Sequence, residues 1–352
     1  MPAKGNISNF NGQHKKYTLF RTFEILNDYS DEKHHLKHSE IQEKLSTLYD
    51  LNVNRKLVRE NIDDINFLGQ PYGIEVKSEK GNGAYLLGRR FEKSEIAFLI
   101  DAVFSSKSIG QRQAVELSGK LQTFLSKNDR KSFKYISKSS DVVRTDSKQV
   151  FYNIDGLLYA IEKKKKVQFN YNRFYLDDGI NEKMKKRTFV ASPYYLVNNQ
   201  GKYYLVCNND KFDDIANYRV DRIFNIKVLD EDVKNIKTMK GCENGFDVVK
   251  YANENIYMFS CDSVEATIKI ENNYAINYVY DWFGTNSKIY MGKDKNIYAT
   301  IHANEQALIY WCLQYGESIE LLKPLNLREK ITKIVKNINK KYEGVGSLWE
   351  KI

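Results

Sequence analysis

Two arginines and a tyrosine near the middle of the chain are well suited to hold an anion. Tyr204 lies within residues 201–207, and Arg219 and Arg222 follow after a polar turn. The pattern predicts two short strands, on which alternate residues point to opposite sides, so that Arg219 and Asp221 share one face. A guanidinium offers a rigid fork that suits phosphate, and a tyrosine can stack on a base. The segment therefore predicts a basic pocket for a nucleotide or a short single-stranded nucleic acid.

The same residues also fit a purely structural role. Arg219 can pair with a carboxylate such as Asp221 or Asp213, and the tyrosines can belong to a hydrophobic core. Both interpretations stay open from the sequence alone.

A second group of suitable residues lies at the start of an amphipathic segment, residues 53–68. Val58, Ile62 and Ile65 form its apolar stripe, which predicts a helix. The polar residues of its first turns lie away from that stripe, and they are Asn54, Arg55, Lys56 and Arg59. Arg and Asn side chains have the geometry for bidentate contacts with guanine and adenine. An ordinary solvated helix face is the alternative.

The neighbouring segments predict the frame that holds this helix. Residues 17–28 and 39–48 have apolar residues at helical spacing, and a Ser-x-x-Gln capping box at Ser39 opens the second of these helices. Two short strands follow at residues 73–77 and 84–87. Three helices and a hairpin make the order of a winged helix-turn-helix, whose second motif helix enters the major groove.

Two further residues join this predicted DNA-binding surface. Lys80 and Asn82 lie in the Gly-rich turn of the hairpin, where they are placed to meet phosphates or the minor groove. Asp63 and Asp64, near the middle of the third helix, should face away from phosphate if the helix binds DNA.

Composition narrows the classes of protein that this chain can belong to. Its 352 residues are 42% hydrophobic and carry a formal net charge of +10, which favours a polyanionic partner. The apolar runs are too short to span a bilayer, and the N-terminus lacks the apolar core of a signal peptide, so we expect a cytoplasmic location. The four cysteines are widely spaced, which predicts reduced thiols. We expect no metal, no cofactor, no catalytic residues and no enzymatic activity.

The rest of the chain changes its periodicity three times. Residues 92–162 predict amphipathic helices, with a polar connection at residues 132–148. Short strands follow from residue 167 to about residue 229, and a loop from about residue 231 to residue 254. Residues 264–341 have a pattern that predicts the order strand, strand, helix, strand, helix. This order suggests a small α/β domain.

Residues 167–230 resemble the WYL domain, named for a Trp-Tyr-Leu triplet. The triplet here is Tyr203-Tyr204-Leu205, with Tyr in place of Trp, and the companion Arg-x-Asp-Arg-Ile motif is residues 219–223. The other supporting segments are Phe169-Asn170-Tyr171, Arg187 and Ser192-Pro193-Tyr194-Tyr195-Leu196. Residues 264–341 resemble the C-terminal extension that often follows WYL domains, through Tyr310-Trp311-Cys312-Leu313, Gly316, Leu322-Lys323-Pro324 and Leu327-Arg328.

The resemblance implies a fold, a site and a function. It implies an α+β multidomain chain, with a winged helix-turn-helix at residues 1–90, a helical linker at 91–162, a WYL domain with an Sm-like β-barrel at 163–232 and an α/β extension at 255–345. The implied ligand-binding residues are Tyr204, Arg219 and Arg222, with Tyr171, Arg187 and Ser192 as additions.

The implied protein is a homodimeric transcriptional regulator of the repressor type, in which the extension helps the dimer to form. It binds double-stranded operator DNA, and its WYL domain senses a nucleotide-like or single-stranded nucleic-acid ligand. Relatives of this kind occur near phage-defence and CRISPR systems. One alternative is an accessory nucleic-acid-binding protein that modulates a CRISPR or phage-defence effector. The other is an enzyme that acts on nucleotides.

Overall fold

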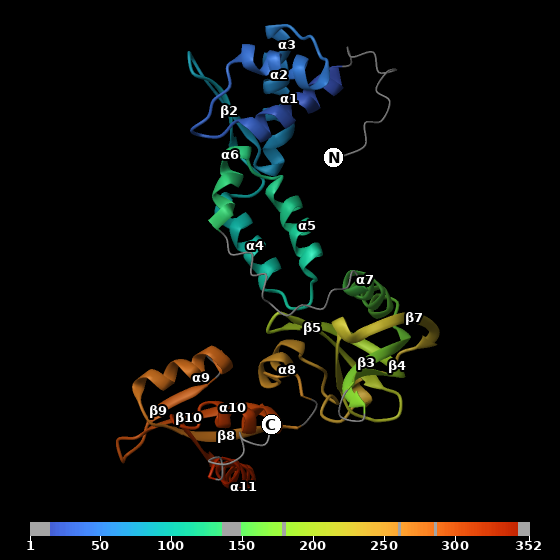
Figure 1. Cartoon of the computed structure of the whole chain (residues 1–352), viewed down its shortest axis with the longest axis vertical. Helices are drawn as coiled ribbons and strands as arrows, with labels where there is room; N and C mark the ends of the chain where they lie inside the picture. Colours follow the sequence, from blue (N-terminus) through green and yellow to red (C-terminus); the bar gives the residue numbers. More distant parts are fainter. Residues whose placement is uncertain (1–14, 136–148, 178–180, 260–261, 285–286, 344–352) are drawn as a thin grey trace. The chain divides into compact units, whose positions relative to one another are not determined.

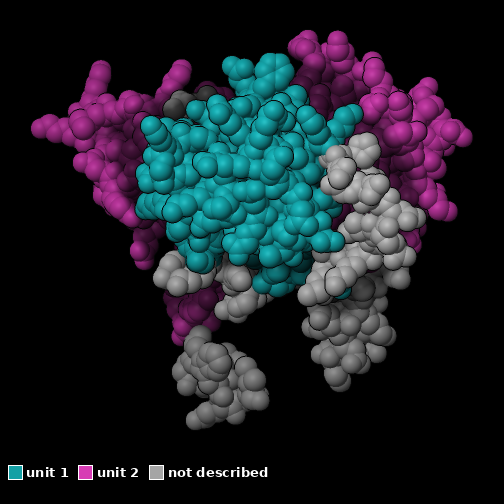
Figure 2. Space-filling model, turned by 90° about the horizontal axis from the view of Figure 1, so that it is seen from above, with its two compact units in different colours: residues 1–146 teal, residues 147–352 magenta. Residues whose placement is uncertain are grey.

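The chain forms two compact units, residues 1–146 and residues 147–352, which Figure 2 colours separately. The computed structural model describes residues 15–135, 149–177, 181–259, 262–284 and 287–343. Both units combine helices with β-sheet, so the prediction of a mixed chain with several sheets is confirmed. None of the described helices has the length and apolar character that crossing a membrane requires.

The first unit begins with three helices and a β-hairpin, the order predicted from the sequence (Figure 1). These elements are α1 (Lys15–Tyr29), α2 (His38–Tyr49), α3 (Arg55–Gly69), β1 (Glu75–Glu79) and β2 (Gly83–Gly88). Their apolar faces meet in one core, which includes Ile25, Leu26, Ile41, Leu45, Val58, Ile62, Ile65, Val76 and Leu86. Leu48, which the helical spacing placed on the buried stripe of α2, is instead half exposed, and Leu51 is buried after the end of the helix.

Helix α2 starts two residues earlier than the predicted capping box at Ser39 allows. Lys37 is the N-cap residue, and its backbone N–H donates to Oε2 of Glu40 at 2.6 Å. The prediction of a Ser39–Gln42 box is therefore wrong, because Gln42 is used elsewhere. Its Nε2 donates to the carbonyl oxygen of Val53 at 2.8 Å and so joins α2 to the residues that precede α3.

A segment before α2 extends the hairpin by backbone pairing. Leu36 and Ala84 exchange two backbone hydrogen bonds, at 2.9 and 2.8 Å. The close approach requires glycine at the start of β2, because a Cβ on Gly83 would lie 2.4 Å from the carbonyl oxygen of Leu36. His35 in the same segment stacks on Tyr85, with ring centroids 4.1 Å apart. The histidine-containing segment, predicted as a polar loop, is thus partly attached to the hairpin.

The first unit continues with helices that have their own core. They are α4 (Lys93–Ser105), α5 (Gln111–Gln122) and the short α6 (Lys127–Arg130). Ile96, Ile100, Phe104, Ala114, Leu125 and Phe133 pack together there. Two arginines contact α1: Arg89, which precedes α4, donates from Nη1 to Asn27 Oδ1 at 2.8 Å, and Arg130 Nη2 of α6 pairs with Asp28 Oδ1 at 3.0 Å.

The second unit opens with α7 (Gln149–Glu162) and a five-stranded antiparallel sheet in the order β6-β5-β4-β3-β7. The strands are β3 (Lys165–Asp177), β4 (Asn181–Asn199), β5 (Lys202–Asn209), β6 (Ala216–Arg219) and β7 (Ile223–Asp232). Within the described residues β6 and β7 are the two edges of this sheet, so the closed barrel that we expected is not observed. Asn153 of α7 donates to the carbonyl oxygens of Val220 and Ile223, at 3.2 and 2.6 Å, and so fixes the helix to the sheet.

The last part of the second unit is a four-stranded antiparallel sheet with helices. Its elements are α8 (Val248–Glu254), β8 (Ser263–Ile270), α9 (Ile276–Phe283), β9 (Lys288–Met291), β10 (Ile297–Asn304), α10 (Glu305–Gln314), β11 (Ile319–Lys323) and α11 (Leu325–Tyr342). The strand order is β11-β8-β10-β9. The predicted strands and last two helices are present, but the sequence analysis missed α8, α9 and β9. The division of the chain into four domains stays a prediction.

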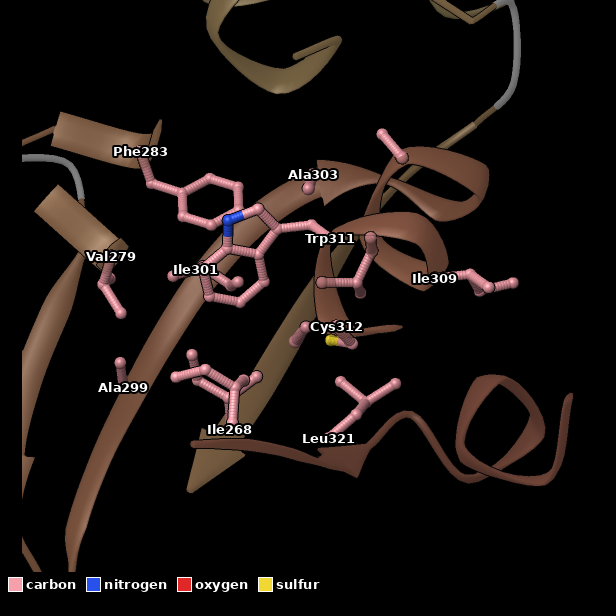
Figure 3. Packing of buried hydrophobic residues seen from close by; sticks show 14 of the residues in the cluster. Ile268, Val279, Phe283, Ala299, Ile301, Ala303, Ile309, Trp311, Cys312 and Leu321 are labelled. Atoms are coloured by element: carbon pink, nitrogen blue, oxygen red, sulfur yellow. The ribbon is translucent and has the colours of Figure 1, made fainter. Parts of the chain in front are cut away.

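The core of this last part lies on one face of the sheet. Trp311 of α10 is fully buried there, and Figure 3 shows its indole beside Phe283 and Ile301. The Phe283 and Trp311 rings meet edge to face, with centroids 4.9 Å apart. Such pairs add about 0.5–1.5 kcal/mol beyond the area they bury. The opposite face of the same sheet carries polar and aromatic side chains.

Candidate nucleic-acid and ligand sites

Helix α3 presents the residues predicted to contact DNA at its N-terminal end. Asn54 is its N-cap residue, and the side-chain Oδ1 accepts a hydrogen bond from the Leu57 N–H at 2.8 Å. Arg55, Lys56 and Arg59 are all exposed on the first two turns. The cap explains why the helix starts where it does, since N-cap asparagine satisfies an N–H that has no partner within the helix. Asn54 therefore has a structural role besides any contact with a base.

Acidic residues limit how far this basic surface extends along α3. Lys56 lies 3.9 Å from Glu60, and Asp63 and Asp64 are exposed. Asp63 comes four residues after Arg59, so the two side chains share one side of the helix. The expectation that Asp63 and Asp64 face away from phosphate stays a prediction, and the position of Asp63 on the side of Arg59 does not favour it. The cations of α3 all lie in its first two turns.

His38, at the start of α2, belongs to the same surface and was missed by the sequence analysis. Its pKa is lowered, first by burial and then by the positive charges of Arg55 and Arg59. Its Nδ1 is buried and has no hydrogen-bond partner within the described residues. No local sequence pattern indicates this contact, because it joins residues about 20 positions apart on two helices.

The hairpin turn holds the other two predicted DNA-binding residues. Lys80 and Asn82 are both exposed between β1 and β2. The Asn82 backbone N–H donates to the Glu79 carbonyl at 3.1 Å, and its Nδ2 donates to Glu79 Oε2 at 3.3 Å. These two bonds hold the turn in shape and leave the Lys80 side chain at its tip.

The predicted ligand pocket centres on Arg219, which is firmly held by a neighbour. Its Nε and Nη2 donate to the two carboxylate oxygens of Asp221, at 3.0 and 2.5 Å, and the Asp221 side chain is fully buried. The hydrogen bond to Asp221 and its charge raise the pKa of Arg219. A guanidinium has five N–H donors, so this bidentate pair does not exhaust it. About a fifth of the Arg219 side chain (22%) remains exposed.

Tyr204 and Tyr171 flank this ion pair from two hydrophobic clusters. Tyr204 lies opposite Arg219 in the β5–β6 ladder and packs beside Val197 and Val206. Tyr171 is buried in the other cluster, and its hydroxyl accepts the Arg219 backbone N–H at 3.4 Å. Burial raises the pKa of Tyr204, against the opposing charges of Arg219 and Arg222. Arg219 thus pairs with a carboxylate and the tyrosines belong to hydrophobic clusters, as in the structural role considered from the sequence. The guanidinium group of Arg219 nevertheless remains partly exposed.

The three remaining predicted ligand residues differ in their positions. Arg222 is half-buried and close enough to Tyr204 to affect its titration. Arg187 is exposed and pairs with Tyr171 in the β3–β4 ladder. Ser192 is fully buried, and its Oγ accepts the Lys234 backbone N–H at 3.0 Å. Ser192 is therefore part of the sheet's interior and is not brought together with the arginines.

Comparison with known proteins gives a family match to part of the second unit and a relative that is similar over most of the chain. The WYL domain family matches residues 153–228, which include most of α7 and most of the five-stranded sheet. The uncharacterized HTH-type transcriptional regulator YobV of Bacillus subtilis (strain 168) is 23% identical over 312 residues, covering 85% of this chain and 93% of that protein.

Two solved structures resemble the chain more distantly. One is the proteasome accessory factor B/C (PafBC) of Arthrobacter aurescens, with 13% identity and a TM-score of 0.27, of which this chain spans about half (49%). The other is a CRISPR Cas-related protein, with 13% identity, a TM-score of 0.37 and coverage of 93% of this chain and 85% of that one. Neither TM-score is high enough to support an inference.

The family match and the likeness to the regulator confirm the resemblance found in the sequence. The match covers the Tyr203-Tyr204-Leu205 triplet and the residues 219–223 motif together. This chain carries a WYL domain and is similar to an HTH-type transcriptional regulator over most of its length.

Proposed function

We propose that this protein is a DNA-binding transcriptional regulator in which α3 binds operator DNA and the WYL domain binds a regulatory ligand. It acts by binding and not by catalysis. Two copies form a homodimer on a pseudo-palindromic site, and the ligand changes the affinity of that dimer for DNA. Repression is the proposed outcome of operator binding.

The observation that carries this proposal is the exposed N-terminal end of α3. Arg55, Lys56 and Arg59 project from a helix whose opposite face is buried against α1 and α2. A hairpin with an exposed Lys80 follows the helix, as the wing follows the recognition helix in winged helix-turn-helix proteins. The likeness to an HTH-type regulator over most of the chain supports the same function.

Operator binding can be measured by fluorescence anisotropy with the DNA upstream of the protein's own gene. Arg59→Ala should weaken binding by about 1–3 kcal/mol if Arg59 contacts a base. Lys120→Ala is the matched control, because Lys120 is an exposed cation on α5 and its removal should leave affinity unchanged.

Two results would oppose this assignment. Unchanged affinity for Arg59→Ala would remove this residue from the interface. Equal affinity of the wild-type protein for upstream DNA and for scrambled DNA of the same length would favour an accessory nucleic-acid-binding protein, which reads no operator.

The sensor role is proposed for the surface around Arg219 and Arg222. A phosphate group would receive hydrogen bonds from the two guanidinium groups, and Tyr204 lies beside them. Short oligonucleotides or nucleotides should therefore shift the operator affinity of the wild-type protein. Arg222→Gln should remove this shift and retain operator binding. It is a better probe than Arg219→Ala, because Arg219 also neutralises the buried carboxylate of Asp221. A normal ligand response in Arg222→Gln would contradict the assignment.

A further inference from the structure

The four-stranded sheet of the second unit has the connectivity of a split β-α-β fold. Its chain order is β8, α9, β9, β10, α10, β11, and its spatial order is β11-β8-β10-β9 with every neighbouring pair antiparallel. In this topology two helices cover one face of the sheet and the other face is open. Ala266, Ile268, Ala299, Ile301 and Leu321 point to the covered face and are buried. The alternate residues of the same strands belong to the open face.

One row of side chains crosses this open face from edge to edge. The strand registers align Tyr290 of β9 with Tyr298 of β10, Tyr298 with Lys269 of β8, and Lys269 with Glu320 of β11. Side chains of directly aligned residues lie on the same face and touch across strands. Tyr290 is 46% exposed on this face, whereas the side chains on the other face of the sheet are buried in the core.

The two tyrosines form a fixed aromatic platform at the β9–β10 end. Their rings are stacked, with centroids 5.8 Å apart and planes inclined by 26°. The Tyr298 hydroxyl donates to Asp294 Oδ2 at 2.6 Å, which orients its ring. Gly292 makes room for that ring, because a Cβ there would lie 2.5 Å from Tyr298 Cε2. The platform is therefore held in place before any ligand arrives.

The charges around the platform are suited to a polyanion. Lys288, Lys293 and Lys295 are exposed on β9 and in the β9–β10 turn, and Lys269 lies next to Tyr298. The acidic groups nearby have basic or polar partners. Glu265 lies 3.4 Å from His302, Glu320 is 2.6 Å from Arg328, Glu271 is 3.1 Å from Lys269, and Asp294 bonds Tyr298 and Asn296. The end of the sheet that carries the tyrosines is thus its basic end.

We propose that this open sheet face binds single-stranded nucleic acid, at a site separate from α3 and from the Arg219 surface of the WYL domain. Bases stack on Tyr290 and on the exposed part of Tyr298, and the lysines contact the phosphates. Four-stranded sheets of this connectivity bind RNA through exposed aromatic residues on their open face, and stacking tolerates any base sequence. The exposed stacked pair and the surrounding lysines favour this ligand over an apolar protein segment.

The test measures binding of fluorescein-labelled dT12 and U12 to the full chain by anisotropy at low salt. Arg222→Gln is present in both proteins compared, so that the oligonucleotide site proposed for the WYL domain does not contribute. In this background Tyr290→Ala should weaken binding of the preferred oligonucleotide about tenfold, as expected for loss of one stacked base. Lys288→Gln should weaken it less and reduce its salt dependence. Tyr274→Ala is the matched control, because Tyr274 is 70% exposed on a turn next to α9, and its affinity should equal that of the wild type. Comparing dT12 with U12 shows whether the strand bound is DNA or RNA.

Three results would overturn the proposal. The first is equal affinity for both oligonucleotides of the Arg222→Gln protein with and without Tyr290→Ala, or no binding by the wild type. The second is loss of binding in Arg222→Gln alone, which would place the strand on the WYL domain. The third is a change of oligomeric state in Tyr290→Ala without a change in oligonucleotide affinity, which would make the face a contact between two copies. Operator binding is measured in a separate experiment. If the protein did not bind its operator, the oligonucleotide measurement would still test the sheet face.

Discussion

His38 couples the proposed DNA-binding surface to pH through folding. The ring is partly buried at the start of α2, facing the charges of Arg55 and Arg59 on α3. Burial and these two charges hold its pKa below the ordinary value of 6.5. In the unfolded chain the imidazole binds its proton at higher pH than in the folded chain. Between the two pKa values the unfolded state carries more protons, so folding is less favourable there as the pH falls.

We expect the free energy of unfolding to fall between pH 7.5 and pH 5.5, and to fall less in His38→Gln. Urea titrations of both proteins at each pH measure this difference. Asp31 does not interfere, because its pKa is lowered from an ordinary value of 3.8 and its effect lies at more acidic pH. Between pH 7.5 and 8.5 the two proteins should respond alike. An identical loss of stability in both on acidification would show that His38 is not responsible.

Residue patterns predicted the apolar stripe of α3 but not every contact around it. Val58, Ile62 and Ile65 are buried as their helical spacing indicated. Leu48 has the same spacing on α2 and is half exposed, because Leu51 beyond the helix fills the core instead. Similarly, the sequence left Arg219 with two possible roles, and its bidentate pairing with Asp221 depends on the turn between β6 and β7.

At the level of elements, the hairpin depends on a third segment of chain that pairs with it. Leu36 and Ala84 exchange backbone hydrogen bonds beside Gly83, which has a φ of 107°. An alanine at this position meets two obstacles: a φ that costs about 1–3 kcal/mol for most residues, and a Cβ 2.4 Å from the Leu36 carbonyl oxygen. Relieving the clash would break the two hydrogen bonds, each of about 1 kcal/mol.

Gly83→Ala should therefore lower the free energy of unfolding by about 3–5 kcal/mol in a denaturant titration. Gly81→Ala is the matched control, since Gly81 also has positive φ (91°) but would place its Cβ in open space. Only the cost of the positive φ applies at Gly81, so Gly81→Ala should lower the free energy of unfolding clearly less than Gly83→Ala does. Equal losses would mean that the pairing of Leu36 with Ala84 contributes nothing.

The elements that the sequence analysis missed are short or are held by distant residues. Helix α9 has 8 residues and β9 has 4, too few for a clear period. The pairing of Leu36 with Ala84 joins residues 48 positions apart, so it has no local pattern. The long amphipathic segments α1, α3 and α7 were found because their apolar stripe repeats over several turns. The open edge of the five-stranded sheet was not foreseen, because the expected barrel came from the family resemblance alone.

For the whole molecule, charge is the property that the proposed function uses most directly. The chain carries a formal net charge of +10. The candidate phosphate contacts on the proposed DNA surface are Arg55, Lys56, Arg59 and Lys80. Binding of such cations to DNA releases counterions. The logarithm of the affinity should therefore fall linearly with the logarithm of the salt concentration, with a slope of about −0.9 for each phosphate neutralised. A flat salt profile would contradict binding to DNA by this surface.

The change in this slope on a single substitution can count the copies of the protein on the operator. The absolute slope includes every lysine near the DNA, so it does not separate one copy from two. The difference between wild type and Lys56→Gln cancels those other contributions. It should be about 0.9 if one copy binds and about 1.8 if a symmetric dimer places two Lys56 side chains on phosphates. Both slopes are measured by anisotropy from 50 to 200 mM salt. A difference of about 0.9 between them would contradict the proposed dimer. No difference at all would place Lys56 off the phosphates, and Lys80→Gln in the hairpin turn would then serve for the same count.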